Sequence, residues 1–283
     1  VDDMDIDPES RELLADAPAS SESAATSTAD AAVARLLLDA GVEAHAFDNE
    51  VLNEVTGANL IPQQEVTPEL FAAQQHRAFG KANPEAVNNA FWLEMVRRGV
   101  TGYEGHYLFG EGERDYGAPA IWSFQRFGMS TTRLPDGRWL QIAGEHEDYY
   151  DQDFWIYNDA VLLDGKGGAQ IYSYPKEVFP PTDFHTATLV GDAVYLIGSL
   201  GYMEERRPGK TQVLRLDLTD FSIHPLPTTG AQPGWLSRHR AQLKGEGIVV
   251  WGGELWVGQN LVALEGRYEL NLASGSWRKM PET

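Results

Sequence analysis

The sequence predicts a mainly β protein with an α-helical N-terminal region, and two observations support this prediction. One pattern occurs at 184–199 and again at 238–253: a histidine, several mixed residues, four apolar residues and a pair of small residues. Upstream of about residue 118, apolar residues recur at helical spacing instead. A strand buried on both faces is continuously apolar, whereas a helix is apolar along one stripe. The two parts of the chain therefore differ in secondary structure.

The first thirty residues are strongly acidic. They hold nine Asp and Glu side chains and a single basic residue, Arg11, and residues 17–30 are small and polar. We expect a flexible lead-in over 1–30, because such a segment buries too little apolar surface to fold. A helical region over 31–117 and a β region over 118–283 follow it.

The composition restricts the classes of function. The chain has 283 residues, no cysteine and a formal net charge of -20. Disulfides and thiolate metal sites are therefore excluded, and a cytoplasmic, reducing location is expected. No run of apolar residues is long enough to span a membrane. The acidic charge repels nucleic acid and favours a basic protein partner.

The helical region begins with an amphipathic pattern at 28–49. Val33, Leu36 and Leu37 share a helix face, and Gly41 stands where a helix would end. The stretch VARLLLDAGVEAHAFD resembles the second helix and following turn of an ankyrin repeat, although the Thr-Pro-Leu-His opening of that repeat is missing. A fainter copy lies at 91–109, where an apolar helix face runs to Gly99 and a turn is expected.

The β region is a repeat. At an offset of 54 residues, the apolar run at 194–197 aligns with 248–251, and 214–218 aligns with 268–272. A third copy, 132–145, fits at an offset of 55. A period of this size indicates a repeat architecture. Each unit contains four short β-type runs, as a propeller blade does.

These units resemble the kelch repeat, in which an apolar strand ends in a glycine pair and an aromatic residue lies near the fourth strand. Gly252, Gly253, Tyr268 and Trp277 match that pattern best. The other units depart from it at three positions, Ala143, Ser199 and Ile223. The resemblance implies a partial kelch-like β-propeller of three to four four-stranded blades. The whole layout is similar to bacterial ankyrin-repeat proteins of unknown role.

Three blades leave two end faces, each expected to be flat and apolar, and something must cover them. Three alternatives arise. The N-terminal region can pack on one face, two copies can close a ring as a homodimer, or 119–127 can supply the outer strand of a hidden blade.

The best candidate site is the acidic segment 144–155, expected as a loop after an inner strand. Its ionisable residues are Glu145, His146, Glu147, Asp148, Asp151 and Asp153. Three interpretations stay open: a solvated loop, a contact for Arg or Lys of a partner, or a site for a hard cation such as calcium. No other cofactor is expected.

The equivalent segments of the other two units complete the candidate partner-binding surface. The middle segment, 200–210, carries Arg206 and Arg207, which can neutralise the acidic loop beside it. The third, 254–262, exposes Trp256 if it is a loop, and an exposed Trp can anchor binding. His185 and His239 occupy matching positions, which favours a structural role in each blade.

The resemblance to kelch and ankyrin proteins implies binding rather than catalysis. We therefore expect a protein–protein interaction module, with an inhibitor or immunity protein against a basic toxin or nuclease as the sharper hypothesis. The alternative is an enzyme: a carbohydrate-acting isomerase, or a metal-assisted hydrolase using 145–153. A kelch-type oxidase needs a cysteine, which is missing, and an iron triad beginning at Glu147 and Asp151 fails at Trp155.

Overall fold

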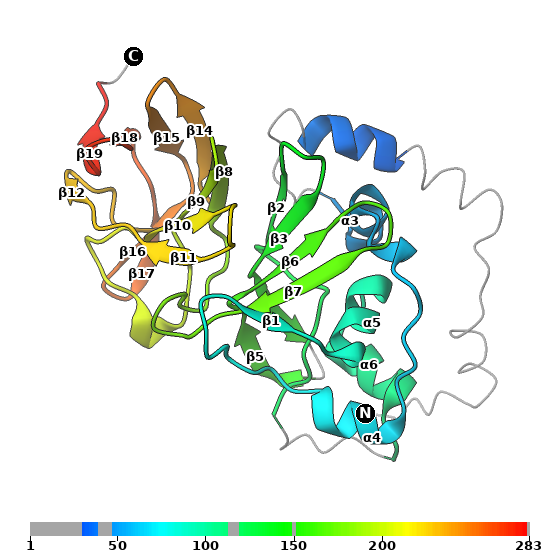
Figure 1. The fold of residues 1–283 in the computed structure, drawn as a ribbon. Coiled ribbons are helices and arrows are strands. Elements are labelled where there is room, and N and C mark those ends of the chain that lie inside the picture. Colours follow the sequence, from blue (N-terminus) through cyan, green and yellow to red (C-terminus); the bar gives the residue numbers. More distant parts are fainter. Residues whose placement is uncertain (1–29, 39–46, 113–118, 149–150, 282–283) are drawn as a thin grey trace.

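The computed structural model describes residues 30–38, 47–112, 119–148 and 151–281, with the backbone alone at 147, 148 and 151–154. The fold is mainly β, with helices gathered in the N-terminal part of the chain (Figure 1). Within the described ranges, no helix combines the length and the apolar character needed to cross a bilayer.

Three sheets repeat one arrangement, in which four strands lie side by side in chain order and pair antiparallel. The first consists of β2 (Ser130–Arg133), β3 (Trp139–Ile142), β6 (Asp159–Leu163) and β7 (Ala169–Ser173). The second consists of β8 (Thr186–Val190), β9 (Ala193–Ile197), β10 (Val213–Asp217) and β11 (Ile223–Pro225). The third contains β14 (Arg240–Lys244), β15 (Gly247–Trp251), β18 (Arg267–Asn271) and β19 (Ser276–Lys279). A short fifth strand, β12 (Thr229–Gly230), pairs parallel with β19. The predicted strands of the three units therefore coincide with observed ones.

The register agrees with the sequence offsets. Ile142, Ile197 and Trp251 are the last residues of β3, β9 and β15, and each pairs with the first residue of the preceding strand. The next residue has a positive φ in every unit: 56° at Ala143, 79° at Gly198 and 65° at Gly252. Glycine adopts this backbone freely, so the small residues mark the point where each strand turns away.

The innermost strand is one strand earlier than the sequence suggested. The first strands approach one another, since β8 contacts both β2 and β14. The apolar strands β9 and β15 lie second in their sheets. Strand β9 packs on both faces against neighbouring sheets, whereas β15 packs on one face through Ile248 and Val250. The apolar pattern alone does not separate the second position in a sheet from the innermost one.

The matching histidines join consecutive first strands. His185 Nε2 lies 2.9 Å from the Ser130 hydroxyl oxygen, and His239 Nε2 lies 2.9 Å from that of Thr186. Both rings are buried. Each histidine thus hydrogen-bonds to the first strand of the preceding sheet, which is a structural contact.

Each sheet carries an insert between its second and third strands. The first insert is the hairpin of β4 (Glu145–Asp148) and β5 (Asp151–Ile156), and the second is a loop containing the short helix η3 (Met203–Glu205). The third is the hairpin of β16 (Glu254–Val257) and β17 (Asn260–Ala263), with β13 (Trp235–Ser237) paired to β16. The segments 144–155 and 254–262, expected as loops, are therefore hairpins.

The three inserts emerge at the same end of the sheets, opposite the β2–β3 and β14–β15 turns (Figure 1). In an antiparallel sheet, the connection from the fourth strand to the next unit leaves from that end as well. We call this surface, formed by the inserts together with 174–183 and 231–238, the loop end.

The N-terminal region supplies a helix over 30–38, α3 (Asn49–Thr56), η2 (Ala58–Leu60), α4 (Pro68–Gln74), α5 (Ala90–Arg98) and α6 (Gly102–Phe109). Helix α5 ends at Gly99, in the left-handed conformation, as predicted. The turn expected after it is instead α6, which begins at a Thr101–Glu104 capping box. Gly41 lies outside the described residues.

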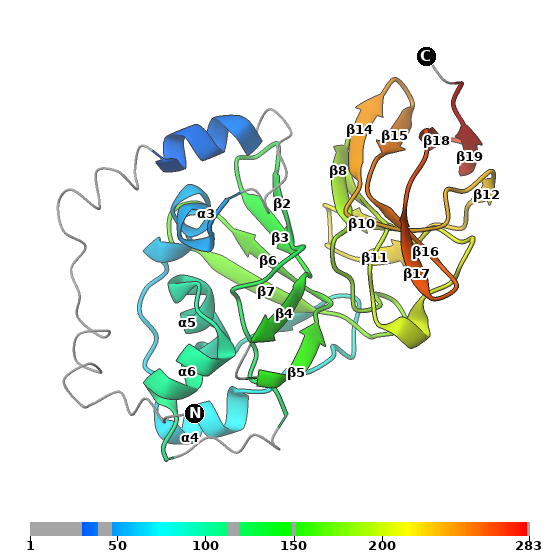
Figure 2. The same cartoon turned by 180° about the vertical axis from the view of Figure 1, so that it is seen from behind.

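These helices cover the first sheet on the side away from the other two sheets (Figures 1 and 2). Phe91, Trp92 and Met95 of α5 share a buried cluster with Val161 and Ile171 of that sheet. Strand β1 (Glu85–Val87) also pairs with β7 as a fifth strand. One end face is therefore covered by the N-terminal region, the first of the three expected alternatives.

The segment 119–127 does not form the outer strand of a further blade. It makes only isolated bridges, one between Ile121 and His76 and one between Phe127 and Glu145. Trp122 is fully buried and stacks on Trp92 with ring centroids 4.8 Å apart. The segment therefore belongs to the core between the helices and the first sheet.

The other end face is polar rather than apolar. Ile248, Val250 and Leu270 of the third sheet pack against the second sheet. Because side chains alternate along a strand, the residues between and beside these three point away from the second sheet. The outward set, which we call the terminal face, consists of Arg240, Gln242, Lys244, Val249, Trp251, Arg267, Glu269 and Arg278. The expectation of a flat apolar face fails here, and the described sheets do not close into a ring.

Candidate functional site

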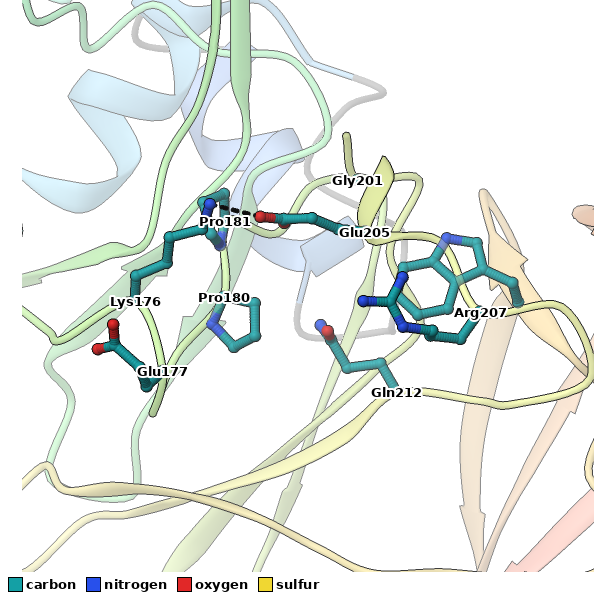
Figure 3. A pocket seen from close by; sticks show the side chains of 9 residues that line it. Lys176, Glu177, Pro180, Pro181, Gly201, Glu205, Arg207 and Gln212 are labelled. Atoms are coloured by element: carbon teal, nitrogen blue, oxygen red, sulfur yellow. Dashed lines mark ion pairs between the residues drawn. The ribbon is translucent and has the colours of Figure 1, made fainter. Parts of the chain in front are cut away.

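The loop end contains a cavity of about 440 Å³ (Figure 3). One wall comes from the connection between the first two sheets and includes Lys176, Glu177, Pro180 and Pro181. The opposite wall comes from the insert of the second sheet, through Gly201, Glu205, Arg207 and Gln212. Trp235 of β13 completes the lining. Three separate connections thus build one hollow, which fits the concave form of ligand and side-chain sites.

Polar contacts fix the rim of this cavity. Lys176 Nζ lies 2.5 Å from Glu205 Oε1, and the two side chains meet across the hollow in Figure 3. Gln212 donates to the Thr182 hydroxyl over 2.9 Å. The Trp235 indole N–H donates to the Leu200 carbonyl over 2.9 Å. The indole ring is therefore held in place before any ligand arrives.

Asp183 anchors the insert that forms the second wall. Its side chain is fully buried, and Oδ1 accepts from the Gly201 N–H over 2.6 Å and from the Ser199 hydroxyl over 3.2 Å. Burial raises the pKa of this carboxyl group, while the two hydrogen bonds act in the opposite direction. Asp183 thereby positions the backbone at Gly201, which lines the cavity.

The predicted residues Arg206, Arg207 and Trp256 come together at this end. The Arg206 guanidinium lies 4.4 Å from the centre of the Trp256 ring, and its N–H groups donate to the Gly201 carbonyl. Arg207 lines the cavity and donates to the Glu204 carbonyl over 2.9 Å. Among the described residues, no carboxylate forms an ion pair with either arginine. Trp256 is half-buried under Arg206, so it is less exposed than expected.

Backbone strain occurs beside this cluster. Phe184 and Arg238 occupy equivalent positions and have positive φ values of 47° and 54°. The Arg238 guanidinium lies 4.1 Å from the centre of the Phe184 ring and 3.1 Å from Glu254 Oε2. Non-glycine residues adopt this backbone at a cost, and such residues gather at functional sites.

The acidic hairpin joins the same end through its second strand. The Ile156 backbone N–H donates to the Tyr202 hydroxyl over 2.8 Å, which links β5 to the insert of the second sheet. Glu145 and His146, expected on an exposed loop, are both buried. Strand β4 causes this, because Glu145 exchanges backbone hydrogen bonds with Phe127 and His146 Nδ1 donates to the Gln125 carbonyl.

The remaining acidic residues lie at the tip of the hairpin. Glu147 and Asp148 belong to β4, and Asp151 and Asp153 belong to β5. Their backbone is described and their side chains are outside the described part of the structure. Among the described side chains, no group of three or more His, Asp or Glu residues could hold a metal ion.

Several residues of the cavity have no counterpart in the sequence-based prediction. Trp235 begins a segment predicted only as a connection between units. Lys176 and Glu177 follow the last strand of the first unit and Gln212 directly precedes β10, and no role was predicted for these three. The Pro180–Pro181 pair and the aromatic start of 235–240 were the available signals. Neither signal indicates a cavity until the three connections are known to lie at one end.

No family model matches the chain, and no curated protein matches it.

Proposed function

We propose that the chain is a protein-binding module and that its partner binds at the loop end. The observation that carries this proposal is that Trp235 and Arg207 line the cavity. Beside them, Arg206 stacks on Trp256, which is the strand partner of Trp235. Trp and Arg are the residues that most often dominate binding energy at protein interfaces. The Pro and Trp walls suit an apolar side chain of the partner, and the Lys176–Glu205 pair suits its polar rim.

The charge of the chain supports a basic partner. A net charge of -20 attracts basic proteins over several ångströms of solvent, and the tip of the β4–β5 hairpin adds Glu147, Asp148, Asp151 and Asp153 to the loop end. Arg207, beside the cavity, would pair with a carboxylate of the partner next to its apolar anchor. An inhibitor or immunity protein for a basic toxin or nuclease meets this description.

We also propose which known repeats the sheets and the helices correspond to. We take the three sheets as kelch-like blades of an incomplete propeller and the helices as a degenerate ankyrin-type region. Equal strand order, equal register and neighbouring first strands support the first part. The helix at 30–38 and the glycine end of α5 support the second.

The test is affinity capture from a cell extract with identification of the bound proteins. The full chain is compared with a double variant, Arg206→Ala with Trp256→Ala, which removes the stacked pair at the loop end. We expect a basic protein bound by the full chain, with capture at least tenfold weaker for the variant and reduced at high salt.

The matched control is Arg138→Ala at the opposite end of the first sheet, where Arg138 pairs with Asp136 in an exposed turn. This variant should capture the same protein as the unaltered chain. If the loop-end variant and the control retain equal amounts of every partner, the loop end is not the binding surface. A set of partners without basic proteins contradicts the charge argument.

A further inference from the structure

The terminal face is a second surface with its own chemistry, and the loop end plays no part in it. Register across three strands places Arg240, Trp251 and Arg267 in one row. The Arg267 guanidinium lies 5.8 Å from the centre of the Trp251 ring. Figures 1 and 2 show this sheet, with β14, β15, β18 and β19, on the side of the described molecule that is away from the helices.

This face is basic in a strongly acidic chain. It carries four cationic side chains, Arg240, Lys244, Arg267 and Arg278, and one carboxylate, Glu269, which pairs with Arg278. Within the described residues, no ion pair engages the other three cations. The Arg278 side chain remains 67 % exposed despite its pair. The face therefore presents guanidinium groups in the planar form that carboxylates match best.

The equivalent positions in the other two sheets show that this charge is particular to the terminal face. In β2 and β8, the positions that match Arg240 are Ser130 and Thr186, both buried between sheets. Long cationic side chains would not fit there, whereas they extend into solvent at the end of the stack. Val249 lies on the same outward side, between Gln242 and Glu269 in the register, and is buried.

We propose that the terminal face binds the acidic N-terminal segment of this chain, residues 1–30. That segment has nine acidic residues against one basic residue. Within it, Asp3, Asp5 and Asp7 alternate with Met4 and Ile6. Asp3, Asp5 and Asp7 share one side of an extended segment, so their carboxylates can together face the arginines of the row.

The segment is long enough for this contact. At about 3.3 Å per extended residue, the 29 residues before the described helix span on the order of 90 Å. The contact occurs either within one chain or between two copies. In both cases, the same acidic segment covers the same residues of the terminal face. Because the contact is between charges, more of the segment is bound at low salt than at high salt.

Photo-crosslinking in the full chain tests the proposal. A photo-reactive phenylalanine replaces Ile6, and the crosslinked peptides are identified by mass spectrometry. We expect crosslinks in peptides that contain 240–251 or 267–278, reduced about tenfold by raising sodium chloride from about 0.05 M to about 0.5 M. A mixture of isotopically light and heavy chains distinguishes contacts within a chain from contacts between copies.

Charge reversal supplies the decisive comparison. The variant Arg240→Glu with Arg267→Glu should lose these crosslinks, and the neutral variant Arg240→Gln with Arg267→Gln should show an intermediate yield. The control Arg138→Glu, a partly exposed arginine between β2 and β3, should keep them. Near-ultraviolet circular dichroism confirms that the variants fold. Crosslinks that fall mainly elsewhere, or that survive the double reversal, overturn the proposal. Loss of loop-end binding does not affect this result.

Discussion

Two buried histidines link the pH of the solution to the stability of the repeats. His185 and His239 each hydrogen-bond through Nε2 to a hydroxyl group on the preceding first strand. Burial lowers the pKa of His185 to about 4. Burial, with a smaller contribution from His185, lowers that of His239 to about 3. Both rings are therefore neutral in the folded protein near pH 7.

Acid should destabilise the fold through these two rings. An unfolded imidazole titrates near 6.5, so the unfolded chain binds more protons than the folded chain below that pH. The free energy of unfolding therefore falls as the pH drops from about 7 to about 4. One pKa unit corresponds to about 1.4 kcal/mol, so the two rings account for several kcal/mol. Urea unfolding at several pH values measures this loss.

A pair of variants separates these histidines from other acid-sensitive groups. His239→Gln keeps a polar side chain without an ionisable ring, so it should lose less stability than the unaltered chain between pH 7 and pH 4. The comparison variant His224→Gln removes an exposed histidine that does not hydrogen-bond between sheets. If both variants lose the same unfolding free energy between pH 7 and pH 4, His239 is not the source of the acid sensitivity.

At the scale of the strand, the residues that end β15 combine two different constraints. Gly252 has a φ of 65°, and a Cβ atom added there would meet nothing within 4 Å. Gly253 has a φ of 74°, and its Cβ atom would lie 2.4 Å from the Ser237 carbonyl oxygen. The first glycine is needed for its backbone angle alone, and the second for angle and space.

Alanine at the two positions should therefore have unequal effects. Gly252→Ala pays only the left-handed backbone cost, about 1–2 kcal/mol. Gly253→Ala has that cost and also displaces the end of β13 or the residues directly after it, so we expect at least about 3 kcal/mol. Thermal or urea unfolding of both variants measures the difference. Equal losses of unfolding free energy in the two variants would show that the backbone at Ser237 moves away from the added Cβ atom at no measurable cost.

The repeated strands could be predicted because their pattern occurs three times, and each occurrence supports the others. The inserts could not be predicted in the same way. They differ in form among the three units, and the acidic residues that made 144–155 look like a loop also tolerate a hairpin, whose edges remain solvated. Helix α6 was missed because Gly102 and Gly105 weaken helix propensity, while the Thr101 cap and packing against Ile121 and Met95 favour it.

The cavity could be predicted only in part, for a related reason. Arg206, Arg207 and Trp256 were identified from their segments, and these segments do meet. Lys176 and Trp235 belong to connections that are distant in sequence. Their approach depends on the way successive sheets pack, which a single sequence does not specify.

At the scale of the whole molecule, the stack of sheets ends differently on its two sides. Helices bury the outer side of the first sheet. Long polar side chains cover the outer side of the third. Repeat proteins need such polar terminal units, since an uncovered apolar repeat face binds further copies. In the described part of the chain, neither end of the stack therefore offers an apolar face to another sheet. Helices cover one end, and polar side chains in contact with solvent form the other.

An apolar terminal face should make the chain self-associate. The triple variant Arg240→Leu, Gln242→Leu and Lys244→Leu replaces the exposed outward side chains of β14. We expect its mass in solution to rise with concentration, because the new apolar patch is buried between copies. Light scattering after size-exclusion chromatography measures this mass.

The control for this variant replaces Arg240 and Lys244 by Gln, which removes charge without adding apolar surface. It should show the same mass at every concentration as the unaltered chain. If the Gln control associates as strongly as the Leu variant, charge repulsion and not solvation of the face prevents association.

The pairing of β1 with β7 has a consequence for biosynthesis. Translation delivers Glu85–Val87 long before Ala169–Ser173, the strand that receives them. Until the ribosome has released residues up to Ser173, β1 has no partner and the apolar side of α5 has no sheet to cover. The nascent chain thus carries its helices uncovered over this interval, which is when a chaperone would have reason to hold it.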